Sequence, residues 1–172
     1  FTALSEKLSA AEVAELLEGY FTHSVDAIFA AGGTLDKFIG DCVMAFFGAP
    51  VPQSDHARRA VQAAIQIQEA QEALNRERAA RGLPTLLVRI AIQSGPVMVG
   101  DVGSRKRVDY TVLGNTVNVA ARLESGVAEA GEITLGGETH RLLAGAFPTE
   151  PLGEFQLKGL QQKVHAFRVL RV

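Results

Sequence analysis

The amino-acid sequence predicts an α+β fold, with an antiparallel sheet that carries helices on one face. The first observation is the order of elements: a long helix, a hairpin of two strands, a second long helix, then further strands and short elements. The second is that helix, hairpin and helix make up most of a ferredoxin-like βαββαβ core, to which small C-terminal strands are added. The third is that 47% of the 172 residues are apolar, enough for one compact domain over 1–172.

Two long helices are predicted from their start and stop signals. The first begins at a capping box, in which Ser9 is followed three residues later by Glu12. Apolar residues then recur at helical spacing until the pair Gly32-Gly33 ends the segment. Either residue of the pair Ser54-Asp55 can cap the second helix, which runs to about Arg81 before a glycine and a proline stop it.

The strands are predicted from short apolar runs bounded by turn residues. Leu35–Ile39 and Cys42–Phe47 form a hairpin around a tight turn at Gly40-Asp41. The remaining expected elements are strands over 86–93, 97–102, 108–113 and 133–135, a polar loop over 103–107, helices over 115–125 and 138–143, and a closing hairpin of 155–157 and 164–170 around Lys158-Gly159.

Composition excludes several classes of protein. The net charge of −2 gives no basic footprint for nucleic acid, so no nucleic-acid partner is expected. The single cysteine, Cys42, rules out a disulfide within the chain and fits a reducing compartment. No apolar run approaches the roughly 20 residues that span a bilayer. Since the chain starts at Phe1 rather than Met, we expect it to be a fragment of a longer protein.

Lys37 and Asp41 are charged residues in a hairpin that is otherwise largely apolar. A tight turn holds the Asp41 carboxylate rigidly, and Mg²⁺ or Mn²⁺ in phosphate chemistry is held by one or two such carboxylates together with substrate oxygens. The alternative for Asp41 is turn chemistry alone, which favours Asp beside Gly. The alternative for Lys37 is an edge-strand lysine that prevents aggregation.

A second polar pair lies on the predicted helix over 115–125. Asn118 and Arg122 are four residues apart, so they project from one helix face. An amide and a guanidinium side by side can hold an anion or a polar oxygen. The alternative is a solvated face on which Arg122 makes a surface ion pair of little energetic value.

Four stretches occur in an order that resembles the catalytic domain of the class III nucleotidyl cyclases, and among these the bacterial adenylate cyclases: residues 1–2, 33–41, 88–100 and 113–124. The similarity covers essentially the whole chain. It implies the cyclase fold and the conversion of ATP to 3′,5′-cyclic AMP and pyrophosphate. In that reaction the ribose 3′-oxygen attacks the α-phosphorus, with two Mg²⁺ or Mn²⁺ ions per site.

The resemblance assigns roles to five of these residues. Asp41 matches one of the two metal-binding aspartates of the family. Lys37 matches the lysine that reads the adenine base, and Thr111 matches its partner, which is Asp in many members and Thr in the class IIIb subgroup. Asn118 matches the residue that positions the ribose, and Arg122 the one that meets developing charge on the phosphate.

Four further residues match phosphate-binding positions. Arg89 and Lys158 match groups that hold the terminal phosphates, and Phe1 and Thr2 match a loop whose backbone N–H groups cradle the phosphates at a helix start. The other metal-binding aspartate of the family lies in the strand just before that loop, so we expect it upstream of Phe1. Thr111 can donate or accept a hydrogen bond, which implies looser base selectivity than Asp would give.

The resemblance also implies a head-to-tail homodimer with two identical shared sites. One subunit would supply Phe1, Thr2, Asp41 and Arg89, and the other Lys37, Thr111, Asn118, Arg122 and Lys158. The full-length protein would carry an upstream regulatory or membrane domain, with this domain in the cytoplasm. Bicarbonate is an effector of many members of the Thr subgroup and is carried over here as an expectation of the same kind.

Three alternatives stay open at the level of the sequence. An inactive cyclase-homology module would bind nucleotide or only dimerise, but such members usually lack the metal Asp, the Asn or the Arg, and this chain has Asp41, Asn118 and Arg122. A diguanylate cyclase would need a Gly-Gly-Asp/Glu-Glu-Phe hairpin, which residues 38–42 do not supply. A structural α+β interaction domain would explain the apolar pattern but not four polar motifs in one order.

Overall fold

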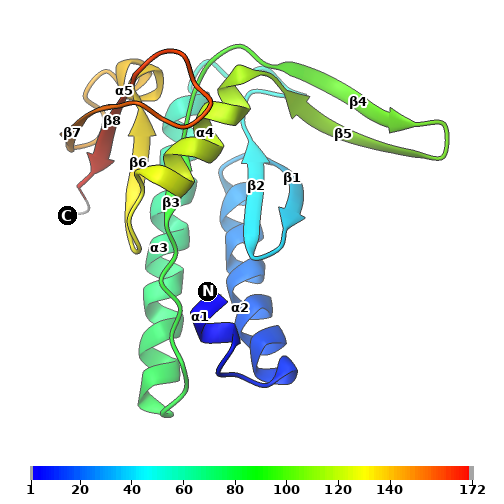
Figure 1. Ribbon diagram of the computed structural model, residues 1–172, viewed down its shortest axis with the longest axis vertical. Coiled ribbons are helices and arrows are strands. Elements are labelled where there is room, and N and C mark those ends of the chain that lie inside the picture. Colours follow the sequence, from blue (N-terminus) through cyan, green and yellow to red (C-terminus); the bar gives the residue numbers. More distant parts are fainter. Residues whose placement is uncertain (1, 171–172) are drawn as a thin grey trace.

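The computed structural model describes residues 2–170 and has the expected α+β fold (Figure 1). Two long helices run side by side, and the strands gather at one end of them (Figure 1). The elements are α1 Thr2–Ser5, α2 Ala10–Ala30, β1 Thr34–Ile39, β2 Cys42–Phe46, α3 His56–Ala80, β3 Ile90–Ile92, β4 Met98–Ser104, β5 Arg107–Leu113, α4 Asn115–Gly126, β6 Ile133–Gly136, α5 Gly137–Leu143, β7 Thr149–Phe155 and β8 Val164–Val169.

The strands form two hairpins and one larger sheet. β1 pairs with β2 and β4 with β5, both antiparallel, while the four-stranded sheet has the order β3-β6-β8-β7. In that sheet β6–β8 and β7–β8 are antiparallel, but β3 and β6 are parallel. The sheet is therefore mixed rather than purely antiparallel. A parallel pair needs a long crossover, which here consists of β4, β5 and α4.

Both long helices cover strand residues with their apolar faces. Val61 of α3 is fully buried in a cluster with Ile133 and Leu135 of β6. Leu16 of α2 is fully buried in a second cluster, with the segment Leu86–Val88 that precedes β3. Burial of each such side chain stabilises the fold by about 1.5–3 kcal/mol. These contacts fix the helices against one side of the strand layer.

The predicted capping interaction is present at the start of α2, whereas the N-cap residue of α3 makes no capping bond. At α2 the backbone N–H of Glu12 donates to Ser9 Oγ at 3.3 Å, and the Ser9 N–H donates to the Glu12 carboxylate at 2.8 Å, so the capping box is confirmed. At α3 the N-cap residue is Asp55, but its side chain makes no capping bond. Its carboxylate instead accepts from Arg59 Nε at 2.7 Å, because an i,i+4 arginine competes for it.

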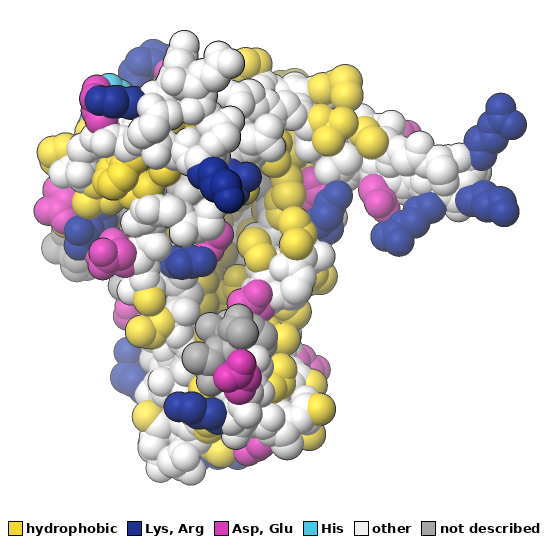
Figure 2. Space-filling model, viewed as in Figure 1, with side chains coloured by type: hydrophobic (Ala, Val, Ile, Leu, Met, Phe, Trp, Pro, Cys, Tyr) yellow, Lys and Arg dark blue, Asp and Glu magenta, His cyan; other side chains and the backbone are white. Residues whose placement is uncertain are grey.

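The hairpin of β4 and β5 projects from the body as a long arm (Figure 1). The expected loop over 103–107 is wrong, because pairing continues to Ser104 opposite Arg107 and leaves a two-residue turn. Figure 2 shows dark-blue Lys and Arg side chains gathered at the free end of this arm, where the sequence has residues 105–107. Met98 and Val108 are exposed along it.

Two other strand predictions need correction. The predicted strand 86–93 is reduced to β3, because residues before Ile90 pack against α2 without pairing to a neighbouring strand. The predicted closing hairpin around Lys158-Gly159 is confirmed by the pairing of β7 with β8, but its first strand is Thr149–Phe155 rather than 155–157. Pro151 and Gly153 hid most of β7 from sequence reasoning, and they are tolerated because the strand lies at a sheet edge with a register shift between them. Among the described helices, none is long and apolar enough to cross a bilayer.

Candidate active site

The β1–β2 hairpin places Lys37 and Asp41 in different surroundings. Ile39 pairs with Cys42, so the turn consists of Gly40 and Asp41, as the sequence predicts. Gly40 has φ +62°, a left-handed conformation that glycine adopts without steric cost. Asp41 is exposed at the tip of the turn, whereas Lys37 lies on the strand.

Lys37 and Thr111 line one cavity of about 300 Å³. Lys37 comes from β1 and Thr111 from β5, so the cavity lies between the hairpin and the arm. Its other lining residues are Ile39, Met44, Val102, Asp109, Val112, Leu113 and Val117. Mostly apolar walls with a few polar groups suit a flat heterocycle that has a polar edge. The structure therefore brings together the two residues predicted to read a base.

Asp36 contacts both Lys37 and Thr111, and it was not among the site residues predicted from the sequence. The Thr111 hydroxyl donates to Asp36 Oδ2 at 2.5 Å, and Lys37 Nζ lies 3.3 Å from Asp36 Oδ1. The Asp36 side chain is 0% exposed, against 43% for the Lys37 side chain. The signal available in the sequence was a second charged residue directly before Lys37 in a strand that is otherwise apolar.

Helix α4 presents Asn118 and Arg122 on one exposed face. Gly114, with φ +145°, redirects the chain from β5 into α4. Val119 and Leu123 are buried on the other side and anchor the helix. Neither the Asn118 nor the Arg122 side chain makes a hydrogen bond or ion pair within the described part of the chain, so both can meet a ligand. The structure confirms their helical placement, and their roles stay predictions.

Asp41 and Arg89 lie in another region of charges. The Arg89 Nε donates to the Glu124 carboxylate at 2.5 Å, which ties the segment before β3 to α4. Burial raises the pKa of the Cys42 thiol, the negative charges of Glu124 and Asp41 raise it further, and Arg89 opposes them. Only Nε of Arg89 bonds Glu124, so the other N–H donors of this half-exposed guanidinium could meet a terminal phosphate.

The remaining predicted residues come from segments other than β1 and β5, which carry Lys37 and Thr111. Lys158 is exposed in the connection between β7 and β8. Phe1 and the side chain of Thr2 lie outside the described residues, although α1 does begin at Thr2. The described lining of the Lys37–Thr111 cavity includes none of Asp41, Arg89, Asn118, Arg122 and Lys158. A single chain therefore does not assemble all of the predicted residues around one cavity.

Asp41 suits a hard divalent cation as one ligand of a shared shell. Mg²⁺ keeps several waters and takes one or two protein carboxylates together with phosphate oxygens. An exposed carboxylate on a rigid turn meets that requirement. Among the described residues there is no group of three or more His, Cys, Asp or Glu side chains that could hold a metal. The other ligands would therefore come from the substrate and from a further carboxylate.

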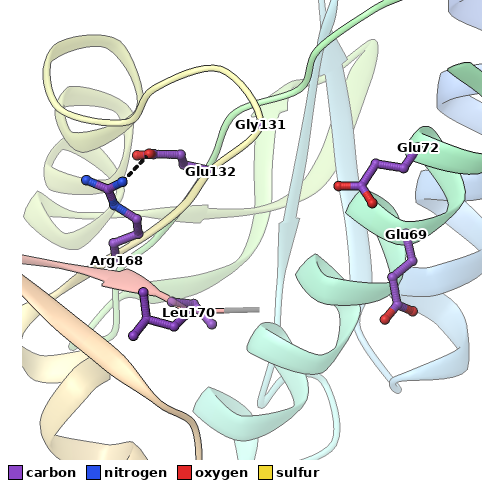
Figure 3. A pocket seen from close by; sticks show the side chains of 7 residues that line it. Glu69, Glu72, Gly131, Glu132, Arg168 and Leu170 are labelled. Carbon is purple, nitrogen blue, oxygen red and sulfur yellow. Dashed lines mark ion pairs between the residues drawn. The ribbon is translucent and has the colours of Figure 1, made fainter. Parts of the chain in front are cut away.

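A second cavity, of about 500 Å³, lies elsewhere (Figure 3). In Figure 3, Glu69 and Glu72 project from α3 toward it, and Glu132 is ion-paired with Arg168 at 2.6 Å. Its described lining contains none of the predicted site residues. Three carboxylates around it would repel a polyphosphate, so we do not place the site there.

Known proteins are similar to this chain over nearly its whole length. The model of the family described as "Adenylate and Guanylate cyclase catalytic domain" matches residues 1–170. Adenylate cyclase 1 of Rhizobium meliloti is 36% identical over 173 residues, which cover 100% of this chain and 26% of that relative. The chain thus spans about a quarter of the length of this curated relative.

Solved structures of two enzyme types share the fold. The crystal structure of the adenylyl cyclase CyaB from P. aeruginosa superimposes with a TM-score of 0.91 at 35% identity, covering 99% of this chain and 88% of that one. The crystal structure of the guanylyl cyclase Cya2 gives a TM-score of 0.90 at 35% identity, covering 98% and 85%. Because the two scores are nearly equal, the fold does not distinguish an adenylyl from a guanylyl cyclase.

Proposed function

Because the chain belongs to the family of adenylate and guanylate cyclase catalytic domains, we propose that it is an adenylate cyclase that converts ATP to 3′,5′-cyclic AMP and pyrophosphate. The observation that carries the choice of ATP is the shared cavity of Lys37 and Thr111. The resemblance gives Lys with Thr to adenylate cyclases, whereas guanylate cyclases of the family usually carry Glu and Cys or similar residues there.

The proposed chemistry needs positioning and charge rather than a covalent intermediate. Asn118 holds the ribose so that its 3′-oxygen can attack the α-phosphorus in line with the leaving pyrophosphate. Arg122 supplies fixed positive charge where negative charge grows, a contribution typically of a few kcal/mol. Arg89 and Lys158 hold the terminal phosphates, together with backbone N–H groups around Phe1 and Thr2.

The family uses divalent metal ions in general, and we propose two Mg²⁺ or Mn²⁺ ions per site. Asp41 would hold them together with phosphate oxygens and a second carboxylate. When bound, such ions lower the pKa of the ribose hydroxyl and neutralise phosphate charge.

The site is proposed to form between two copies of the chain, head to tail. Support comes from the lining of the Lys37–Thr111 cavity, whose described residues include neither Asp41 nor Arg89. A partner copy can bring its own Asp41 to this cavity, and twofold symmetry then gives two identical sites. Exposed apolar side chains along the β4–β5 arm, such as Met98, give a partner apolar surface to bury.

The test is to incubate the full-length protein with Mn²⁺ and either ATP or GTP, and to measure cyclic nucleotide and pyrophosphate. We expect cyclic AMP from ATP and little cyclic GMP from GTP. Preferred formation of cyclic GMP would contradict the proposed base. Absence of product from both nucleotides, in a folded dimer, would contradict the proposed activity.

The second candidate is a cyclase-homology module that binds nucleotide without turnover. It is supported by the described residues, among which no group of three or more His, Cys, Asp or Glu side chains could hold a metal ion. The exposed and unpaired Asn118 and Arg122 favour the enzyme instead. Nucleotide binding without cyclic product would select this module.

A further inference from the structure

We propose that Asp36 sets the base preference of the site by fixing the hydrogen-bonding direction of Thr111. The inference deepens the proposed adenylate cyclase function and rests on it for the reaction. It concerns the cavity that Lys37 and Thr111 share. Its ligand class is a purine nucleotide with a 6-amino group and an unprotonated N1.

A β-bulge brings Asp36 to this position. Leu35 pairs with Ala45 and Lys37 with Met44, so β1 has one extra residue opposite β2, and that residue is Asp36. In a regular strand consecutive side chains face opposite sides, which would separate Asp36 from Lys37. A bulge bends the strand and redirects side chains. Here it leaves Lys37 Nζ 3.3 Å from Asp36 Oδ1.

The side chain of Asp36 is fully buried where the two hairpins meet. Its side chain is 0% exposed, and its hydrogen-bond donor Thr111 lies 75 residues further along the chain. The contact to Lys37 is an ion pair, and Oδ1 has no hydrogen-bond partner among the described residues. A buried carboxylate is costly unless it is partnered. The Asp36 carboxylate thus contacts the two residues proposed to bind the base, Lys37 and Thr111.

A carboxylate can only accept hydrogen bonds, so the O–H proton of Thr111 is directed at Asp36 Oδ2. The Thr111 oxygen can then only accept from a ligand. The Lys37 ammonium can only donate. The cavity therefore offers an acceptor from Thr111 and a donor from Lys37.

This arrangement matches adenine and mismatches guanine. Adenine has a donor at its 6-amino group and an acceptor at N1, which are complementary to Thr111 and Lys37 respectively. Guanine has an acceptor at O6 and a donor at N1. Without Asp36, the Thr111 hydroxyl could rotate and donate to a 6-oxo group, so that threonine alone would not discriminate. Asp36 is thus a positioning residue that acts through Thr111.

The first test compares ATP with inosine triphosphate, which has the 6-oxo group and N1–H of guanine without its 2-amino group. In Asp36→Asn the side chain keeps its size, but its amide can donate to the Thr111 oxygen and free the hydroxyl proton. We expect the ratio of kcat/KM for ATP to that for inosine triphosphate to fall on the order of tenfold. Asp26→Asn, the same change at an exposed position of α2, is the control and should leave the ratio unchanged. An unchanged ratio in folded Asp36→Asn overturns the proposal.

The second test separates selectivity from simple support of the hairpin. In a Thr111→Val background the hydroxyl is gone, so Asp36→Asn should cause no further change in the ratio. A change of the same size in both backgrounds would show that Asp36 does not act through Thr111, and would overturn the proposal.

A third measurement keeps this inference separate from the proposed reaction. Binding of ATP and of inosine triphosphate, measured by calorimetry, needs no turnover. In Asp36→Asn the ratio of the Kd for inosine triphosphate to the Kd for ATP should fall on the order of tenfold. A protein that makes no cyclic product but shows this shift would refute the reaction and support the role of Asp36.

If Asp36→Asn does not fold, the Thr111 hydroxyl proton of the unaltered protein is followed by NMR. Slow exchange with water is expected, and averaging with water would overturn the proposal.

Discussion

Lys37 and Thr111 enter one cavity from different hairpins, as their predicted pairing on a base requires. The sequence could identify both, because Lys37 lies in the stretch 33–41 and Thr111 lies two residues before the stretch 113–124. They could not reveal Asp36, because its burial depends on a bulge in β1 and on a contact with β5. Local sequence does not encode such a long-range pairing.

Lys37→Met should weaken the use of ATP. The change removes a charged donor at the base but keeps most of the apolar stem, so the cavity wall is retained. Loss of a charge-assisted hydrogen bond predicts a fall in kcat/KM for ATP of about tenfold to a hundredfold. Steady-state kinetics checks it, with circular dichroism as the control for folding. An unchanged kcat/KM would remove Lys37 from the base site.

His23 should make stability depend on pH. Burial lowers the pKa of the His23 imidazole below its ordinary value of 6.5, and its Nε2 has no hydrogen-bond partner among the described residues. The unfolded chain then takes up a proton more readily than the folded one, so stability falls as the pH drops below about 6.5.

In His23→Gln that loss should be smaller. Melting temperatures of both proteins between pH 7.5 and 5.5 measure it, and the two curves should diverge toward the acid end. Parallel curves would mean that His23 takes up its proton equally easily in the folded and unfolded states.

Among the elements, those with strong local signals were predicted well. The capping box of α2, the turn at Gly40-Asp41 and the helix α4 lie where the sequence indicates. The strand β7 was predicted too late in the sequence, because Pro151 and Gly153 disfavour a strand that forms only through pairing with β8. The arm was predicted too short, since polar residues 103–107 read as a loop although the strands continue to pair.

Helix α4 depends on Leu123 for its position. Leu123 is 0% exposed and belongs to the same cluster as Val119 and Leu157. Leu123→Ala should lower the free energy of unfolding by about 2–5 kcal/mol. It should also lower kcat, because the helix that carries Asn118 and Arg122 loses its anchor.

Chemical denaturation and single-turnover assays would measure the two effects. Leu142→Ala, at a side chain 40% exposed on the neighbouring helix α5, is the matched control and should change both quantities little. Equal effects of the two substitutions would contradict the anchoring role of Leu123.

At the scale of the whole molecule, the α+β architecture follows from the order of elements, and its identity as a cyclase domain follows from motifs spread over the chain. The parallel pairing of β3 with β6 does not follow from local sequence, since it depends on a crossover through the arm and α4. The same holds for the site. Asp41 belongs to the same chain as the Lys37–Thr111 cavity but does not line it, and we propose that a second copy brings its Asp41 there.

The most direct test of this shared site combines Asp41→Ala and Arg122→Ala, each expected to be inactive alone. The two variants are co-expressed with different tags, and the heterodimer is purified through both tags. In a shared-site dimer one site carries both substitutions and the other is intact, so the heterodimer should recover about half of the wild-type activity for ATP. A heterodimer no more active than either variant alone would contradict the account.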